Sequence, residues 1–130
     1  GFLRQLGVPA NEAILTDASG LSRQNLVTPR AVAALLRGMD QSEYGSLFAS
    51  LLPIAGQDGS LAERLKGPAT AGRIRAKTGS LTGVAALAGY GLNAKGELLA
   101  FVLFANHYSP AHLNATGLLD RIAELIARSR

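Results

Sequence analysis

Apolar and polar positions divide the chain into a first half with helical spacing and a second half that contains strands. The helices expected in the first half lie at residues 2–6, 29–41, 42–52 and 60–67. Thr28 is a good N-cap for the longest of them, and Pro29 occupies its first helical position. Ser42 and Ser60 are the expected N-caps of the two helices that follow. Residues 12–17 read as a strand.

The second half predicts a sheet followed by a helix. Its expected strands cover residues 73–79, 84–92 and 97–106. Residues 93–96 form a hairpin turn, and the nearly continuous apolar run of the last strand is typical of burial on both faces. Residues 114–130 predict an amphipathic helix capped by Asn114. Its expected buried stripe is Leu118, Leu119, Ile122, Leu125 and Ile126. The fold class predicted is α+β, an antiparallel sheet with flanking helices.

Composition narrows the class of protein. The chain has 130 residues, of which 48% are apolar and 17% charged, which is typical of one globular domain. The net charge of +4 comes from scattered arginines rather than a basic stripe, so nucleic acid is not an expected partner. Cysteine is absent, and no apolar run approaches the roughly 20 residues of a transmembrane segment.

The tripeptide Lys77-Thr78-Gly79 is the main candidate for chemistry. It ends one predicted strand, with a second antiparallel strand close behind. A lysine there supplies a fixed cation, a threonine hydroxyl can hold a carboxylate, and a glycine lets a substrate lie against the strand. The main-chain N–H of Ser80 would then be free to meet a developing oxyanion. These residues suit half of an acyl-transfer site, but they equally suit a strand end with a solvated lysine.

Other motifs fail on their context. A P-loop requires glycine where Ala71 and Ala76 stand, and the Gly-rich residues 89–94 lead into a hairpin rather than a helix. His107 and His112 are five residues apart with no nearby carboxylate. We therefore expect no metal site and no cofactor.

Three sequence blocks together resemble one family. They are "TDASGLSRQNLVTP", "LPIAGQDGSLAERLKG" and "GRIRAKTGSLTGVAALAGY", in this order. They are similar to the C-terminal part of D-alanyl-D-alanine carboxypeptidase/endopeptidases of the class C penicillin-binding proteins, and the resemblance covers essentially the whole chain. It implies a serine β-lactamase-like, transpeptidase-like domain. It also implies that peptidoglycan peptides are the substrates, that β-lactams are inhibitors, and that the protein is periplasmic or otherwise extracytoplasmic.

The resemblance assigns roles to individual residues. Lys77 and Thr78 would recognise the carboxylate of the substrate and support proton transfer, Gly79 would line the cleft, and the N–H of Ser80 would belong to the oxyanion hole. A loop near the site, with a structural role first, would contain Asp17, Ser19, Gly20 and Ser22.

Two motifs of the family are missing. Ser-x-x-Lys occurs nowhere in the chain, and Ser22 to Asn25 has the wrong spacing for Ser-x-Asn. Residues 1–130 are therefore expected to be a single partial domain that lacks the nucleophile-bearing half, and to be inactive alone. The N-terminal remainder of the enzyme would be its partner, and its two longest strands would expose an apolar patch. The alternative is a penicillin-binding fold that serves as a non-catalytic binding or scaffold module.

Overall fold

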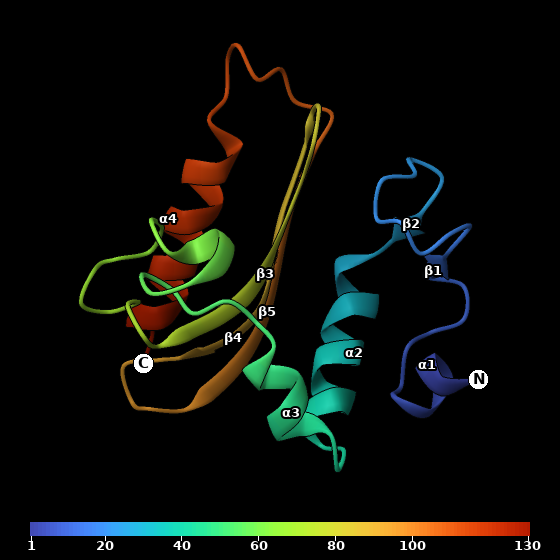
Figure 1. The fold of residues 1–130 in the computed structure, drawn as a ribbon, viewed down its shortest axis with the longest axis horizontal. Coiled ribbons are helices and arrows are strands. Elements are labelled where there is room, and N and C mark those ends of the chain that lie inside the picture. Colours follow the sequence, from blue (N-terminus) through green and yellow to red (C-terminus); the bar gives the residue numbers. More distant parts are fainter.

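The computed structural model describes residues 1–130 and places a three-stranded antiparallel sheet at the centre, in the order β3-β4-β5. The strands are β3 (Ile74–Leu81), β4 (Val84–Leu92) and β5 (Leu98–Asn106). All three predicted strands are thus confirmed. Helix α4 covers one face of the sheet and α2 the other (Figure 1). None of the helices combines the length and the apolar character that crossing a membrane requires.

The turn between β4 and β5 is held by one buried side chain. Asn93 is 3% exposed, and its Oδ1 accepts hydrogen bonds from the main-chain N–H groups of Lys95 and Glu97, at 3.0 and 2.9 Å. Its amide nitrogen donates to the Glu97 carboxylate at 2.7 Å. The predicted hairpin is therefore confirmed.

Helix α4 (Ala115–Arg128) is capped as predicted, because the Asn114 side chain accepts from Gly117 N at 2.9 Å. Its predicted buried stripe is only partly correct, because Leu119 is buried and Ile126 packs against the core while other members are exposed. The buried residues are Ala115, Leu119, Ala123 and Ala127. Leu118 and Leu125 are exposed. The alanines let the helix axis approach the sheet closely, so the leucines beside them point away from it.

The core lies between α4 and the sheet. Eleven buried residues form one cluster there, and most come from β3, β4, β5 and α4. They are Ala55, Leu61, Ile74, Ala76, Ala85, Leu87, Phe101, Ala115, Leu119, Ala123 and Ala127. Because side chains alternate along a strand, the even-numbered residues of β3 face this core and the odd-numbered ones face away.

The opposite face of the sheet packs against α2 (Pro29–Asp40) and α3 (Gly45–Ser50). Thr28 caps α2 as predicted, with its hydroxyl accepting from Ala31 N at 3.0 Å. The helix predicted to begin at Ser42 is shorter than expected, because Ser42 Oγ donates to Met39 O at 2.7 Å and accepts from Tyr44 N.

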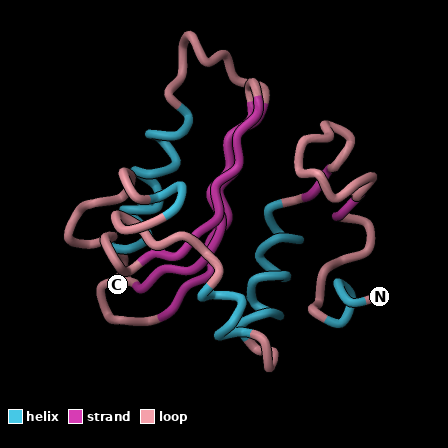
Figure 2. The backbone as a smooth tube through the Cα atoms, viewed as in Figure 1, coloured by secondary structure: helices cyan, strands magenta, loops and turns pink.

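The first residues form a separate small unit beside α2. It contains α1 (Phe2–Gln5), confirming the short helix, and the two-residue strands β1 (Ala13–Ile14) and β2 (Leu26–Val27), which pair antiparallel. The strand predicted over residues 12–17 is therefore largely wrong. Long loops fill the rest of this region (Figure 2).

The helix predicted over residues 60–67 is also wrong. Only a 3-10 turn, η1 (Gly59–Leu61), forms there, and Ser60 lies inside the turn instead of capping a helix. Leu65 has a φ of 55°, which no α-helix contains. Thr70 is buried and its hydroxyl donates to Leu65 O at 2.7 Å, which fixes this irregular path.

The apolar patch expected on the two longest strands is not present. Helices α4 and α2 lie on opposite faces of the sheet, and of the large apolar side chains on β4 and β5 only Leu98 is exposed, although most side chains of β5 are half-buried. The exposed large apolar residues lie mainly in the N-terminal unit, α3 and α4. They include Phe2, Ile14, Leu15, Leu21, Leu26, Leu47, Leu51, Leu118 and Leu125.

Candidate functional site: the open edge of β3

Strand β3 has one edge that is occupied only along its first half. Ala55 N donates to Ile74 O at 2.9 Å, and Ala76 N donates to Pro53 O at 3.0 Å. Beyond Ala76 no strand pairs with this edge. In an antiparallel ladder, alternate residues direct both their N–H and their C=O to the same side. Thr78 and Ser80 therefore present their main-chain groups at the open edge, as Ala76 does to Pro53.

The predicted residues Lys77, Thr78, Gly79 and Ser80 lie along this open stretch. Lys77 is exposed, and its ammonium donates to Thr78 O at 2.7 Å, so it lies at the edge rather than extending into solvent. Thr78 is half-buried, and its hydroxyl donates to Ser60 Oγ at 2.9 Å. Ser80 is exposed. A cation, a pair of hydroxyls and outward N–H groups thus gather along the open edge of β3, a combination that suits an anionic substrate.

Gly79 is in close contact with the neighbouring strand. It pairs with Ala86 of β4, and a Cβ added to Gly79 would lie 3.3 Å from the Ala86 Cβ. A larger side chain would press against β4 and cover part of the exposed strand. The absence of a side chain here therefore keeps the face of β3 accessible beside Lys77.

The loop of residues 16–25, which contains the four predicted loop residues, is tied together by its own side chains. Asp17 Oδ1 accepts from the Ser19 N–H at 3.1 Å and from the Ser19 hydroxyl at 3.0 Å. Gly20 has a φ of +73°, a conformation that a glycine adopts without strain. Ser22 Oγ accepts from Gln24 N at 3.2 Å. All four predicted residues thus lie in one loop, in which Asp17, Ser19 and Ser22 take part in hydrogen bonds.

Asn25, whose role was not predicted from the sequence, holds this loop together through its side-chain amide. Its carbonyl oxygen accepts from Thr16 N at 2.7 Å and from the Thr16 hydroxyl at 2.9 Å. Its amide donates to the Asp17 carboxylate at 3.0 Å. The hydrogen bonds from Asn25, and next those from Ser19, hold the pKa of the Asp17 carboxyl below its usual value.

A single arginine joins this loop to the sheet. Arg23 Nη2 donates to Thr82 O at 2.8 Å, in the turn between β3 and β4. The loop therefore lies beside the turn that follows the Lys77-Thr78-Gly79-Ser80 stretch of β3. A cavity of about 340 Å³ lies between this loop and the sheet, with Leu81 and Phe104 on one side and Leu26 of β2 on the other, and Lys77 to Ser80 do not line it.

A buried carboxylate supports the same end of α2. Glu12 is 8% exposed, accepts from the Thr28 hydroxyl at 2.6 Å and forms an ion pair with Arg30. Thr28 N also donates to Glu12 O at 3.0 Å. Glu12 thus joins β1 to the N-terminus of α2. The sequence offered no signal for it, because the partners are 16 and 18 residues away.

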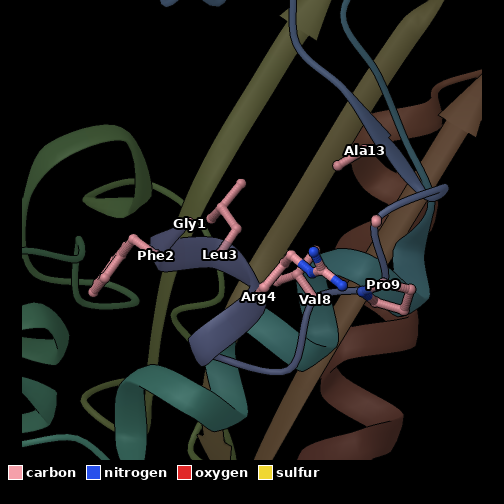
Figure 3. Close-up of a pocket in the computed structure, with 8 residues that line it drawn as sticks. Gly1, Phe2, Leu3, Arg4, Val8, Pro9 and Ala13 are labelled. Carbon is pink, nitrogen blue, oxygen red and sulfur yellow. The ribbon is translucent and has the colours of Figure 1, made fainter.

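The chain contains no paired nucleophile and base, no metal-ligand cluster and no catalytic group in its N-terminal cavity. No serine or threonine hydroxyl is hydrogen-bonded to a lysine or histidine in this chain, and no three His, Cys, Asp or Glu side chains gather as metal ligands would. A cavity of about 420 Å³ lies near the N-terminus (Figure 3). Its lining side chains are mostly apolar, and Arg4 is the only charged one among them. It therefore contains no nucleophile or general base.

Several known proteins are similar to this chain in sequence. The sequence matches the D-Ala-D-Ala carboxypeptidase 3 (S13) family over residues 1–126. It is 42% identical over 116 residues to D-alanyl-D-alanine carboxypeptidase DacB of Haemophilus influenzae, covering 88% of this chain and 24% of that protein. It is 40% identical over 130 residues to a D-alanyl-D-alanine carboxypeptidase of an Actinomadura species, covering 96% of this chain and 24% of that protein.

Solved structures of a penicillin-binding protein have a similar fold. The crystal structure of penicillin binding protein 4 (dacB) from Haemophilus influenzae superimposes with a TM-score of 0.78 at 39% identity, over 96% of this chain and 27% of that one. A structure of the same protein complexed with a β-lactam gives a TM-score of 0.76 at 42% identity, over 82% and 25% of the two chains. The predicted fold class is confirmed. The chain spans about a quarter of the length of the curated relatives it matches.

Proposed function

The chain belongs to the D-Ala-D-Ala carboxypeptidase 3 (S13) family, and from this premise we propose that it is the C-terminal portion of a serine-type D-Ala-D-Ala carboxypeptidase or endopeptidase. In this proposal, residues 1–130 are a partial penicillin-binding domain and supply one wall of the active site. The remainder of the same enzyme supplies the nucleophilic serine and its base. The substrate class is the D-Ala-D-Ala end of peptidoglycan peptides, or their cross-links, outside the cytoplasm.

The observation that carries this proposal is the open edge of β3. Lys77 and the Thr78 hydroxyl lie where the terminal carboxylate of a peptide laid along the strand would be held. The outward N–H of Ser80 follows two residues later, at the place where the scissile carbonyl oxygen would lie. A peptide bound in this way is extended, as in other complexes that add a strand to a sheet edge.

The reaction has two steps in this proposal. The serine oxygen attacks the carbonyl carbon of the penultimate D-Ala, its proton passes to the base, and the oxyanion accepts a hydrogen bond from Ser80 N–H. The C–N bond then breaks, and the terminal D-Ala leaves as the amine with a proton from the base. Water hydrolyses the acyl-serine and regenerates the enzyme. A β-lactam would acylate the same serine, because opening its ring breaks the corresponding amide bond.

The test compares the full-length enzyme with the isolated 130 residues. We expect a fluorescent penicillin to label the full-length enzyme covalently and D-Ala to be released from a peptide that ends in D-Ala-D-Ala. The isolated chain should do neither. An acyl adduct on Ser19, Ser22 or Ser80 by mass spectrometry would contradict the assignment. Reversible penicillin binding by the full-length protein without D-Ala release would instead support a non-catalytic binding module.

A further inference from the structure

Ser60 contacts the candidate site although it lies far from Lys77-Thr78-Gly79 in sequence. Its Oγ accepts the proton of the Thr78 hydroxyl at 2.9 Å, across 18 residues of sequence. Ser60 is exposed, whereas Thr78 is half-buried. Because a hydroxyl can accept one proton and donate its own, the Ser60 proton is free to meet a ligand from solvent.

The fold holds Ser60 in this position by one side-chain and one main-chain hydrogen bond in the surrounding turn. Asp58 Oδ1 accepts from Ile54 N at 2.6 Å, and Gly56 N donates to Leu61 O at 2.9 Å, which closes the turn on both sides of Ser60. Leu61 itself is fully buried in the core. The hydroxyl is therefore placed by a closed turn anchored in the core, although the residue is exposed.

Ser60 also stands at a defined point of the edge. The segment before it pairs with β3 only as far as Ala76, whose N–H donates to Pro53 O at 3.0 Å. The open stretch begins at Thr78, the residue that contacts Ser60. Lys77 adds its ammonium at Thr78 O, 2.7 Å away. A negatively charged group at the start of the open stretch would thus meet a cation and a pair of hydrogen-bonded hydroxyls.

We propose that Ser60 is a specificity-determining residue that completes the carboxylate site with Thr78; this inference rests on the proposed function. The two hydroxyls contain two protons, of which one joins them and the other points outward. The Thr78-to-Ser60 hydrogen bond polarises the Ser60 hydroxyl and strengthens its own donation to the carboxylate. The pair therefore acts as one donor, and removing either hydroxyl weakens recognition of a free carboxylate.

The experiment uses the full-length enzyme with Ser60→Ala, Ser60→Thr, Thr78→Val and the double variant Ser60→Ala/Thr78→Val. Substrates are a peptide with a free C-terminal carboxylate and the same peptide as its methyl ester. We expect Ser60→Ala to lower kcat/KM for the free acid by about ten- to hundredfold, the range for a hydrogen bond to a charged group. The loss should appear mainly in KM, the ester should change little, and Ser60→Thr should restore most of the activity.

The double variant distinguishes a coupled pair from two separate donors. We expect it to cost little more than the larger single change, because each single variant already breaks the pair. Additive losses, equal losses on acid and ester, or no loss in Ser60→Ala would overturn the inference. Ser46→Ala, at an exposed serine of α3, is the matched control, and thermal unfolding checks that Ser60→Ala is folded.

Failure of the proposed function would look different. A wild-type full-length enzyme that releases no D-Ala, or a Lys77→Ala variant as active as the wild type, would contradict the proposed site and the role of Ser60 together. If the wild type is active, Lys77→Ala is impaired and Ser60→Ala is unaffected, only the inference on Ser60 is wrong.

Discussion

The hydroxyl of Tyr90 donates a hydrogen bond of 2.6 Å to the main-chain oxygen of Leu36, which joins the middle strand of the sheet to α2. Both residues are buried, and the Tyr90 ring also meets Phe48 of α3 edge to face, with centroids 6.5 Å apart. One side chain thus holds both helices on the face of the sheet away from α4.

Tyr90→Phe should destabilise the full-length enzyme modestly. It removes one neutral hydrogen bond, worth about 0.5–1.5 kcal/mol net, while keeping the ring and its packing. The free energy of unfolding in urea measures the change. Tyr44→Phe is the control, because Tyr44 is 52% exposed. Equal effects of the two substitutions would show that the contact with Leu36 contributes nothing.

The same hydroxyl predicts a loss of stability at alkaline pH. Burial, and then the negative charge of Asp40, raise the pKa of Tyr90 from 10.0 to about 12. The folded state therefore holds this proton more tightly than the unfolded state does. Its contribution is fully present below pH 10 and is lost as the pH rises through about 12.

We expect the difference in unfolding free energy between wild type and Tyr90→Phe to be constant near neutral pH and to shrink above pH 10. Comparing the two proteins cancels the titration of lysines, which occurs in the same range. A difference that stays constant up to pH 12 would contradict the raised pKa of Tyr90.

Replacing Asn25 should loosen the loop of residues 16–25 without unfolding the sheet. Asn25→Ala removes five hydrogen bonds between its amide group and Thr16 or Asp17. The main-chain N–H groups left without a partner would turn to water, and the loop would open more often. Trypsin cleavage after Arg23 measures this, with about a tenfold faster cut for each 1.4 kcal/mol of lost local stability.

Asn11→Ala, at an exposed asparagine outside the loop, should leave the cleavage rate unchanged. If Asn25→Ala is cut no faster than the wild type, the hydrogen bonds of Asn25 do not hold the loop closed.

These hydrogen bonds also explain where prediction from sequence failed. The N–H groups of Thr16 and Asp17 bond to the side chain of Asn25, so residues 12–17 cannot pair as a full strand. Leu61 is drawn into the core and Leu65 takes a positive φ, so residues 60–67 cannot continue a helix. In both cases contacts with residues outside the segment override its local preference.

The helix caps, the strands and the Lys-Thr-Gly motif could be predicted because each depends on residues that are close together in sequence. The caps Thr28 and Asn114 bond to N–H groups three residues away, and the three strands follow from their own apolar patterns. Lys77-Thr78-Gly79 is likewise a contiguous motif. Ser60 and Arg23 contact β3 and its turn across 18 and 59 residues, so only the fold could reveal them.

The buried face of α4 predicts that enlarging an alanine there lowers stability more than the same change at an exposed alanine. Ala123 is fully buried against the sheet, so Ala123→Leu should crowd the core and cost about 1–3 kcal/mol of unfolding free energy. The same change at Ala111, an exposed residue before α4, should have little effect on thermal stability. A tolerated Ala123→Leu would mean that α4 can rotate its leucines toward the sheet.

The last prediction separates the proposed roles of Lys77 and Thr78. Lys77 supplies a full charge at a cleft wall, where losing a charge-assisted contact is worth roughly 2–4 kcal/mol, or about 30- to 1000-fold in rate. Lys77→Ala in the full-length enzyme should therefore slow acylation severely. Thr78 contributes a hydroxyl to a charged acceptor, worth about 1.5–3 kcal/mol. Thr78→Ala should mainly weaken ligands that have a free carboxylate.

The measurement is the second-order acylation rate of each variant with a penicillin and with the methyl ester of its carboxylate. We expect Lys77→Ala to slow both reactions, because the lysine also supports proton transfer, and Thr78→Ala to slow the free acid more than the ester. Ser46→Ala, on α3 away from the open edge of β3, is the control. Acylation of Lys77→Ala at the wild-type rate would contradict the proposed role of Lys77. An equal loss of rate on acid and ester in Thr78→Ala would contradict the proposed role of Thr78 in carboxylate recognition.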